Sequence, residues 1–150
     1  MSTKVIKKWA LLPLLALLAF TANANNGYNF DEYVVYYNAF TADNLPAEMA
    51  KNYAITRSKS RAVLNISVQK KAVPGKMAVP VNAQVKVTLK NFVGQQKELT
   101  LRQIKEGDAI YYISEFRVSH KELITFTIEA LPEGTDKPLE FSFKQQFYTN

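Results

Sequence analysis

The sequence predicts an all-β protein, a seven-stranded antiparallel immunoglobulin-like β-sandwich with one short helix between the first two strands. The first observation is an alternation of apolar and polar residues that recurs along the chain, as in strands with one buried and one solvated face. The second is that short segments with Gly, Pro, Asn or Asp separate these stretches. Seven short strands joined in this way are typical of such a sandwich. A small closed barrel has the same alternation and is the alternative fold.

The N-terminal segment has the pattern of an export signal. Three lysines precede an uncharged run over residues 9–20, and small residues follow at Ala22 and Ala24. We therefore predict a signal peptide over residues 1–24, cleaved after Ala24, and a single mature domain over residues 25–150. The apolar run is shorter than the ~20 residues that a membrane-spanning helix needs, so we expect no transmembrane anchor, with an uncleaved anchor as the alternative.

The first predicted strand covers residues 28–40, which are rich in Tyr and Val but have no clean phase. Residues 45–53 lack the alternation and predict a short helix, with Asp43 or Asn44 as its cap and Pro46 in its first turn. This helix lies in the long connection between the first and second strands.

Six further strands follow. Alternation predicts them over residues 61–70, 79–89, 97–104, 109–119, 122–131 and 138–148. The clearest is 79–89, where Val, Ala and Leu side chains share one face and mostly polar side chains share the other. In 97–104, Ile104 falls out of phase, which indicates a bulge or a strand end. Turns around Gly107 and Gly134 join the last strands in hairpins.

The mature domain is only weakly basic. The whole chain has 19 Lys and Arg against 13 Asp and Glu, or +6. Three of the lysines lie in residues 1–24, which leaves 16 against 13, or +3, in residues 25–150. We expect no nucleic-acid partner, because such a partner needs a concentrated basic surface. The chain has no cysteine, so the mature domain must be stable without disulfides, and we expect a monomer.

The residues that support catalysis are scarce. His120 is the one histidine and falls in a predicted turn, and a zinc site needs three or four N or S ligands. No Gly-x-Ser-x-Gly element presents a serine. Glu106 and Asp108 flank a hairpin glycine, where acidic residues are common for turn formation alone. We therefore expect no enzyme, no metal and no cofactor.

A cell-wall hydrolase that works through two carboxylates is the enzymatic alternative. It requires that two acidic side chains converge in one cleft. The candidates are Asp31, Glu32, Glu106, Asp108 and Glu115.

Two surface features are candidates for binding. If the second strand begins early, Arg57, Lys59 and Arg61 point the same way and suit an anionic protein, glycan or lipid headgroup. The less specific reading, which we favour from sequence, is an edge strand that charge keeps soluble. Tyr36 and Tyr37 are adjacent, so their rings point to opposite faces of the strand and one of them lies outside. Core aromatics with hydroxyls at the rim are the alternative.

Several motifs taken together resemble a known family. They are residues 53–61, 63–68, 106–112, 115–118 and 143–148. In combination they are similar to the exported bacterial proteins grouped as domain of unknown function, family 4426, over nearly the whole mature chain. The resemblance implies a Gram-negative periplasmic protein and brings no reaction, ligand or catalytic residue.

These observations favour a non-enzymatic periplasmic module that binds an anionic partner. A structural or assembly subunit that pairs strand edges, as a pilin or its chaperone does, is the alternative from a different class.

Overall fold

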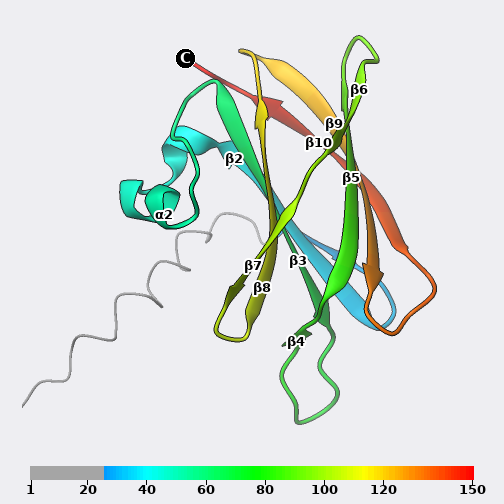
Figure 1. Ribbon diagram of the computed structural model, residues 1–150. Coiled ribbons are helices and arrows are strands. Elements are labelled where there is room, and N and C mark those ends of the chain that lie inside the picture. Colours follow the sequence, from blue (N-terminus) through cyan, green and yellow to red (C-terminus); the bar gives the residue numbers. More distant parts are fainter. Residues whose placement is uncertain (1–25) are drawn as a thin grey trace, which may run out of the picture.

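The structure is a computed structural model that describes residues 26–150 as two packed antiparallel sheets (Figure 1). In sheet A the strand order is β1 (Asn26–Asn29), β2 (Tyr33–Thr41), β3 (Arg61–Lys70), β8 (Ala109–Arg117) and β7 (Arg102–Glu106), with β4 (Val79–Pro80) paired to β3. In sheet B the order is β10 (Leu139–Phe147), β9 (Glu122–Pro132), β5 (Ala83–Asn91) and β6 (Gln96–Leu99). The predicted antiparallel sandwich is confirmed, and the signal peptide predicted over residues 1–24 lies outside the described residues.

The structure has ten strands in residues 26–150 where the sequence predicted seven, because three predicted stretches are each two strands. A turn at Asp31 and Glu32 divides the first stretch into β1 and β2. A break after Pro80 separates β4 from β5. The predicted strand over residues 97–104 is also two strands, because the chain leaves sheet B after Leu99 and enters sheet A at Arg102. The phase break at Ile104 is therefore a change of sheet, and not a bulge within one strand.

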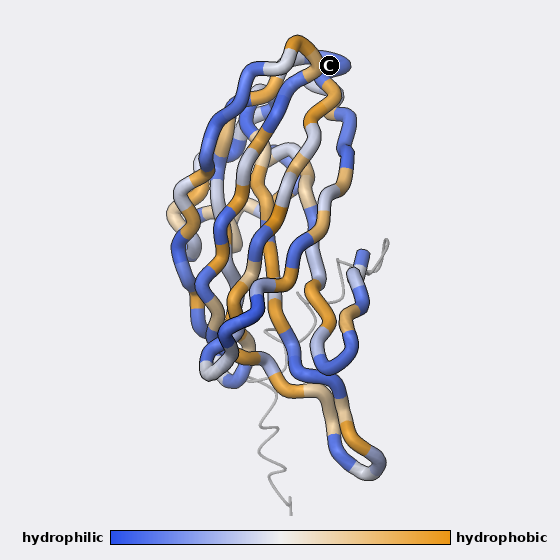
Figure 2. Tube along the Cα trace, turned by 90° about the vertical axis from the view of Figure 1, so that its right-hand side faces the viewer, coloured by the Kyte–Doolittle hydropathy of each residue, from blue (hydrophilic) through white to orange (hydrophobic). Residues whose placement is uncertain are grey.

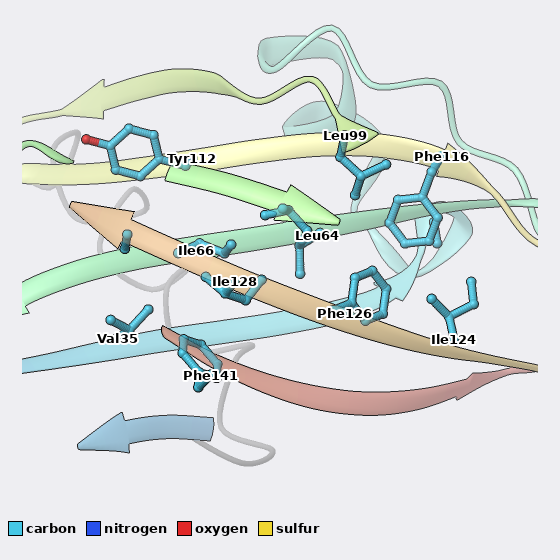
Figure 3. Packing of buried hydrophobic residues seen from close by; sticks show 14 of the residues in the cluster. Val35, Leu64, Ile66, Leu99, Tyr112, Phe116, Ile124, Phe126, Ile128 and Phe141 are labelled. Carbon is cyan, nitrogen blue, oxygen red and sulfur yellow. The ribbon is translucent and has the colours of Figure 1, made fainter. Parts of the chain in front are cut away.

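The alternation of the strands builds one core between the sheets. Figure 2 shows hydrophobic and hydrophilic residues alternating along the chain trace. Leu64 and Ile66 of sheet A and Phe126 and Ile128 of sheet B are fully buried, and they point into the space between the two layers (Figure 3). Burying each such side chain contributes roughly 1.5–3 kcal/mol, so this layer carries most of the stability of a domain that has no disulfide.

The predicted helix is confirmed as α2 (Ala47–Asn52), with a difference at its start. Asp43 and Asn44 belong to the 3-10 turn η2 (Ala42–Asn44) and cap nothing, and Pro46 is the residue before the first turn. Both segments cover one end of the outer face of sheet A. They form a second apolar cluster with β3 and β8, whose buried members are Ala42, Leu45, Ala50, Ile55, Val63 and Ile113.

A tyrosine connects the two sheets. The Tyr112 hydroxyl of β8 accepts a hydrogen bond from the backbone N–H of Ala83 at the start of β5, at 2.7 Å. The same hydroxyl lies 3.1 Å from the Gln103 side-chain amide of β7, which also donates to the Asn82 side chain at 2.9 Å. This network ties sheet A to the first residue of the central strand of sheet B.

Within residues 26–150, no helix is both long and apolar enough to cross a bilayer.

Candidate functional site

The three predicted cations lie at the entry to β3. Strand β3 begins at Arg61, so Arg57 and Lys59 belong to the loop before it and do not continue a strand face. Both side chains are exposed. The Arg57 guanidinium donates a hydrogen bond to the backbone carbonyl of Asp43 at 3.0 Å. Arg57, Lys59 and Arg61 therefore do not form a row along one strand face, as they would if β3 began earlier. They remain near one another because only a few residues of loop separate them.

Glu115 of β8 fixes this loop. Its Oε1 lies 3.6 Å from the Arg61 guanidinium and accepts a hydrogen bond from the Thr56 backbone N–H at 3.3 Å. The Val118 backbone N–H donates to the Ser60 carbonyl at 3.0 Å. The loop is therefore held against the end of β8 by one carboxylate and one backbone hydrogen bond.

A fourth cation joins the three. Arg117 of β8 is directly opposite Arg61 of β3 in the register of sheet A, and its side chain is exposed. We call these four residues, Arg57, Lys59, Arg61 and Arg117, the cationic surface. Sequence reasoning missed Arg117 because no local signal shows that β3 pairs with a strand about 50 residues further along the chain.

The cationic surface is not edge protection. Strand β3 lies between β2 and β8 in sheet A and is an interior strand, so charges at its start do not shield an open edge. Arg61 and Arg117 oppose each other across the ladder, and like charges in that position are destabilising. In residues 26–150, the Arg61 Nε is also buried with no hydrogen-bond partner. The arrangement therefore has an electrostatic cost, against which Glu115 supplies one ion pair.

The structure separates the two predicted tyrosines from the cations. Tyr37 packs in the core, with its ring centroid 4.2 Å from that of Phe143. Tyr36 lies on the outer face, where a Cβ at Gly27 would be only 3.0 Å from its ring. The prediction that one of the pair is outside is confirmed. In register the pair is opposite Ser67 and Ile66, five or six residues along β3 from Arg61, or roughly 17–20 Å at ~3.4 Å per residue.

The acidic residues considered for a hydrolase do not converge. Asp31 and Glu32 lie in the β1–β2 turn at one edge of sheet A, whereas Glu106 and Asp108 flank the β7–β8 turn at the other edge. Glu115 pairs with Arg61.

The one histidine is engaged at the C-terminal end of the chain. His120 Nδ1 accepts a hydrogen bond from the Thr149 backbone N–H at 3.2 Å. Among residues 26–150, no group of three or more His, Cys, Asp or Glu side chains is arranged to hold a metal ion.

Two tyrosines next to α2 have raised pKa values. Burial, together with a hydrogen bond and the charge of Glu106, raises the pKa of Tyr53 far above its ordinary value. Burial and the same carboxylate raise the pKa of Tyr111. Both hydroxyls therefore stay protonated in the folded protein at a pH where an exposed tyrosine ionises.

We expect a loss of stability above about pH 10 that depends on these tyrosines. Tyrosines in the unfolded chain ionise near pH 10, so above that pH the unfolded state binds fewer protons than the folded state and stability falls. Urea midpoints at pH 8 and pH 11 measure the fall. It should be smaller for Tyr53→Phe/Tyr111→Phe than for the wild type, while the exposed Tyr28→Phe control keeps the wild-type fall. Equal falls in all three proteins would contradict the assignment.

Comparisons with known proteins identify relatives of this chain. The family model described as domain of unknown function (DUF4426) matches residues 28–150. The crystal structure of a DUF4426 family protein from Pseudomonas aeruginosa PAO1 is 30% identical, with a TM-score of 0.68 over 81% of this chain and 93% of that one. No curated protein matches in sequence.

A second group of solved structures shares the fold at low identity. A copper-bound variant of FetP from uropathogenic Escherichia coli strain F11 is 13% identical, with a TM-score of 0.56 over 83% of this chain and 95% of that one. FetP as isolated, after expression in the periplasm of E. coli, is 14% identical, with a TM-score of 0.55 over 83% and 94% of the two chains. At these identities the similarity shows the fold alone.

Proposed function

This chain belongs to the DUF4426 family, and we propose that it is a non-enzymatic periplasmic binding module whose cationic surface holds an anionic partner. The observation that carries the proposal is the position of that surface. Four cations gather where an interior strand begins, with Glu115 as the carboxylate paired among them. Protection of a sheet edge does not account for cations at this position, whereas a group of four cations suits an anionic partner.

We infer that the sandwich is of the immunoglobulin-like type. Its strand order supports this, since β2-β3-β8-β7 packed on β10-β9-β5-β6 follows the A-B-E-D and G-F-C arrangement with one added strand next to C. Such a fold hosts many unrelated functions, so the proposal rests on the cationic surface and not on the fold.

The proposed location in the periplasm rests on two observations. Residues 1–24 have the pattern of an export signal, and FetP, which shares the fold, was expressed in the periplasm of E. coli. The absence of cysteine fits a domain whose stability comes from the core.

The copper that FetP binds does not fit the residues of this chain. Copper sites use imidazole and sulfur donors. This chain has one histidine and no cysteine, and His120 already accepts a backbone hydrogen bond. Met49 packs against the α2 cluster, while Met77 is exposed in the loop beyond β3. We therefore leave copper binding out of the proposed function.

We also propose that the module has no catalytic activity. Asp31 and Glu32 share an exposed turn at one edge of sheet A, Glu106 and Asp108 flank a turn at the other edge, and Glu115 pairs with Arg61. A glycosidase needs two carboxyl groups that face each other across one cleft.

The proposal predicts that Arg57→Ala/Lys59→Ala/Arg117→Ala weakens binding to heparin, used as a soluble polyanion, by about 10- to 100-fold. Each exposed cation near an anionic surface contributes about 1 kcal/mol, and Arg61 is kept because it pairs with Glu115. Titration calorimetry at two salt concentrations measures the affinity and its salt dependence.

A matched triple variant controls for net charge. Lys70→Ala/Lys105→Ala/Lys137→Ala removes the same charge from exposed positions away from the cationic surface and should bind heparin like the wild type. If both triple variants lose the same affinity, binding follows net charge alone and the cationic surface is not the site.

A further inference from the structure

An apolar tip projects from the turn between β5 and β6. Phe92 and Val93, which we call the apolar tip, are 79% and 63% exposed. The turn is firmly built. The Gly94 N–H donates to the Asn91 carbonyl at 3.1 Å, and the Asn91 side chain exchanges hydrogen bonds of 2.8 and 2.9 Å with Gln95. Phe92 and Val93 are the two central residues of this turn, so their side chains point away from the sandwich.

The apolar tip lies at the same end of the sandwich as the cationic surface. Strand β5 ends at Asn91, which pairs with Ile124 near the start of β9. The turn before β9 follows directly on Arg117, the last residue of β8, and Arg61 opposite it begins β3. In Figure 1 the β5–β6 turn and the β8–β9 turn both stand at the top of the molecule.

More cations surround the apolar tip. Lys90 and Lys97 flank it on β5 and β6, and Lys121 lies in the β8–β9 turn; all three are exposed. This end of the domain therefore presents an exposed aromatic ring and a β-branched side chain among lysines and arginines. An aromatic and a β-branched side chain exposed side by side, with charges around them, form a small apolar patch that a partner can bury.

We infer that the anionic partner is a lipid bilayer with acidic headgroups, on which the cationic surface docks while the apolar tip enters the interface. This inference rests on the proposed function and names its partner. A bilayer takes both features at once, because headgroup phosphates attract the cations and the interfacial layer buries a Phe and a neighbouring apolar side chain. A partner that offers negative charge alone would satisfy the cations and leave Phe92 in water.

The opposite end of the sandwich also has a loop with exposed apolar side chains, which is the alternative point of contact with a bilayer. Residues 71–78 connect β3 to β4 and project below the sandwich in Figures 1 and 2. Val73 and Met77 in this loop are 55% and 87% exposed. The other turns at that end hold acidic residues that an acidic membrane repels. They are Asp31, Glu32, Glu106, Asp108, Glu133 and Asp136. That end also carries Lys70, Lys71, Lys76, Lys105 and Lys137, so its charges nearly balance. At the end with the apolar tip, the seven cations named above outnumber Glu98, Glu115 and Glu122, so charge favours that end.

A single-tryptophan reporter tests the orientation. The chain has one tryptophan, Trp9 in the predicted signal segment. With Trp9→Phe in the background, an introduced indole is the only one whether or not that segment is removed. Phe92→Trp should show a blue-shifted emission and quenching by brominated lipid when vesicles of phosphatidylcholine with about one third phosphatidylglycerol are added. Met77→Trp, equally exposed at the other end, should show neither change.

Co-sedimentation with the same vesicles measures the contribution of the apolar tip. Phe92→Ser/Val93→Ser should weaken vesicle binding at least about tenfold, because each side chain loses part of its transfer to the interface. It should leave heparin binding at the wild-type level. Val73→Ser/Met77→Ser is the matched control and should keep wild-type binding to both probes.

The outcomes separate the inference from the proposed function. Heparin binding that depends on the cationic surface, without any vesicle binding, would overturn the bilayer as partner and leave the proposed function standing. A response from the Met77→Trp reporter with a silent Phe92→Trp reporter would overturn the orientation. Equal binding to vesicles of phosphatidylcholine alone would show that the acidic headgroups are not recognised.

Discussion

Phe126→Ala should lower the free energy of unfolding by about 3–5 kcal/mol. Phe126 is fully buried at the centre of sheet B, and its ring is 4.8 Å from that of Phe143 and 5.5 Å from that of Phe116 on sheet A. Removing it deletes one of the aromatic contacts between the sheets and leaves a cavity that the neighbouring strands cannot fully close.

Urea denaturation followed by circular dichroism measures this change. Phe92→Ala is the matched control, because it removes the same atoms from a ring that is 79% exposed, and it should shift stability by no more than about 0.5 kcal/mol. A Phe126→Ala protein as stable as the control would mean that the two sheets do not meet at this ring.

Tyr112→Phe should lower the free energy of unfolding by about 1–3 kcal/mol although it removes a single oxygen atom. That oxygen accepts the hydrogen bond of the Ala83 N–H at 2.7 Å and lies within hydrogen-bond distance of the Gln103 side chain. Without it, the N–H at the start of β5 is left unpaired in a partly buried position, and sheet A loses one of its polar links to this end of β5.

Hydrogen exchange locates this effect. The amide of Ala83 should exchange faster in Tyr112→Phe than in the wild type, while amides in the middle of β3 keep their protection. Tyr28→Phe, which removes a hydroxyl from an exposed side chain, should change neither stability nor exchange. If the Ala83 amide exchanges at the wild-type rate in Tyr112→Phe, the Tyr112 hydroxyl does not protect that amide.

Local pattern predicted the strands but not their partners. Alternation in residues 61–70 predicts which side chains of β3 are buried, because a strand has a period of two whatever it pairs with. It carries no information on whether β3 is an edge strand or an interior one, and that distinction reversed the interpretation of Arg57 and Lys59. The crossing between β6 and β7 was visible only as a phase break at Ile104, since a change of sheet and a bulge leave the same trace in the sequence.

For the candidate site, too, the sequence predicted the residues that are close along the chain and missed those that strand pairing brings near. Arg57, Lys59 and Arg61 are close in sequence, so their proximity could be predicted even though the strand begins later than the row required. Arg117 and Glu115 reach them through the pairing of β3 with β8. Phe92 and Val93 stand between Asn91 and Gly94, two residues typical of turns, and this placement of an aromatic residue was a signal that sequence reasoning left unused.

The pairing of β3 with β8 also sets the order in which this protein can fold. Leu64 meets Ser114 across that ladder, so about 50 residues must be available before the interior strand of sheet A gains its second neighbour. Closing so large a loop has an entropic cost that precedes any reward from contacts, and domains dominated by such pairings fold in milliseconds to seconds. A chain emerging N-terminus first therefore exposes one side of β3 until residue 117 has arrived.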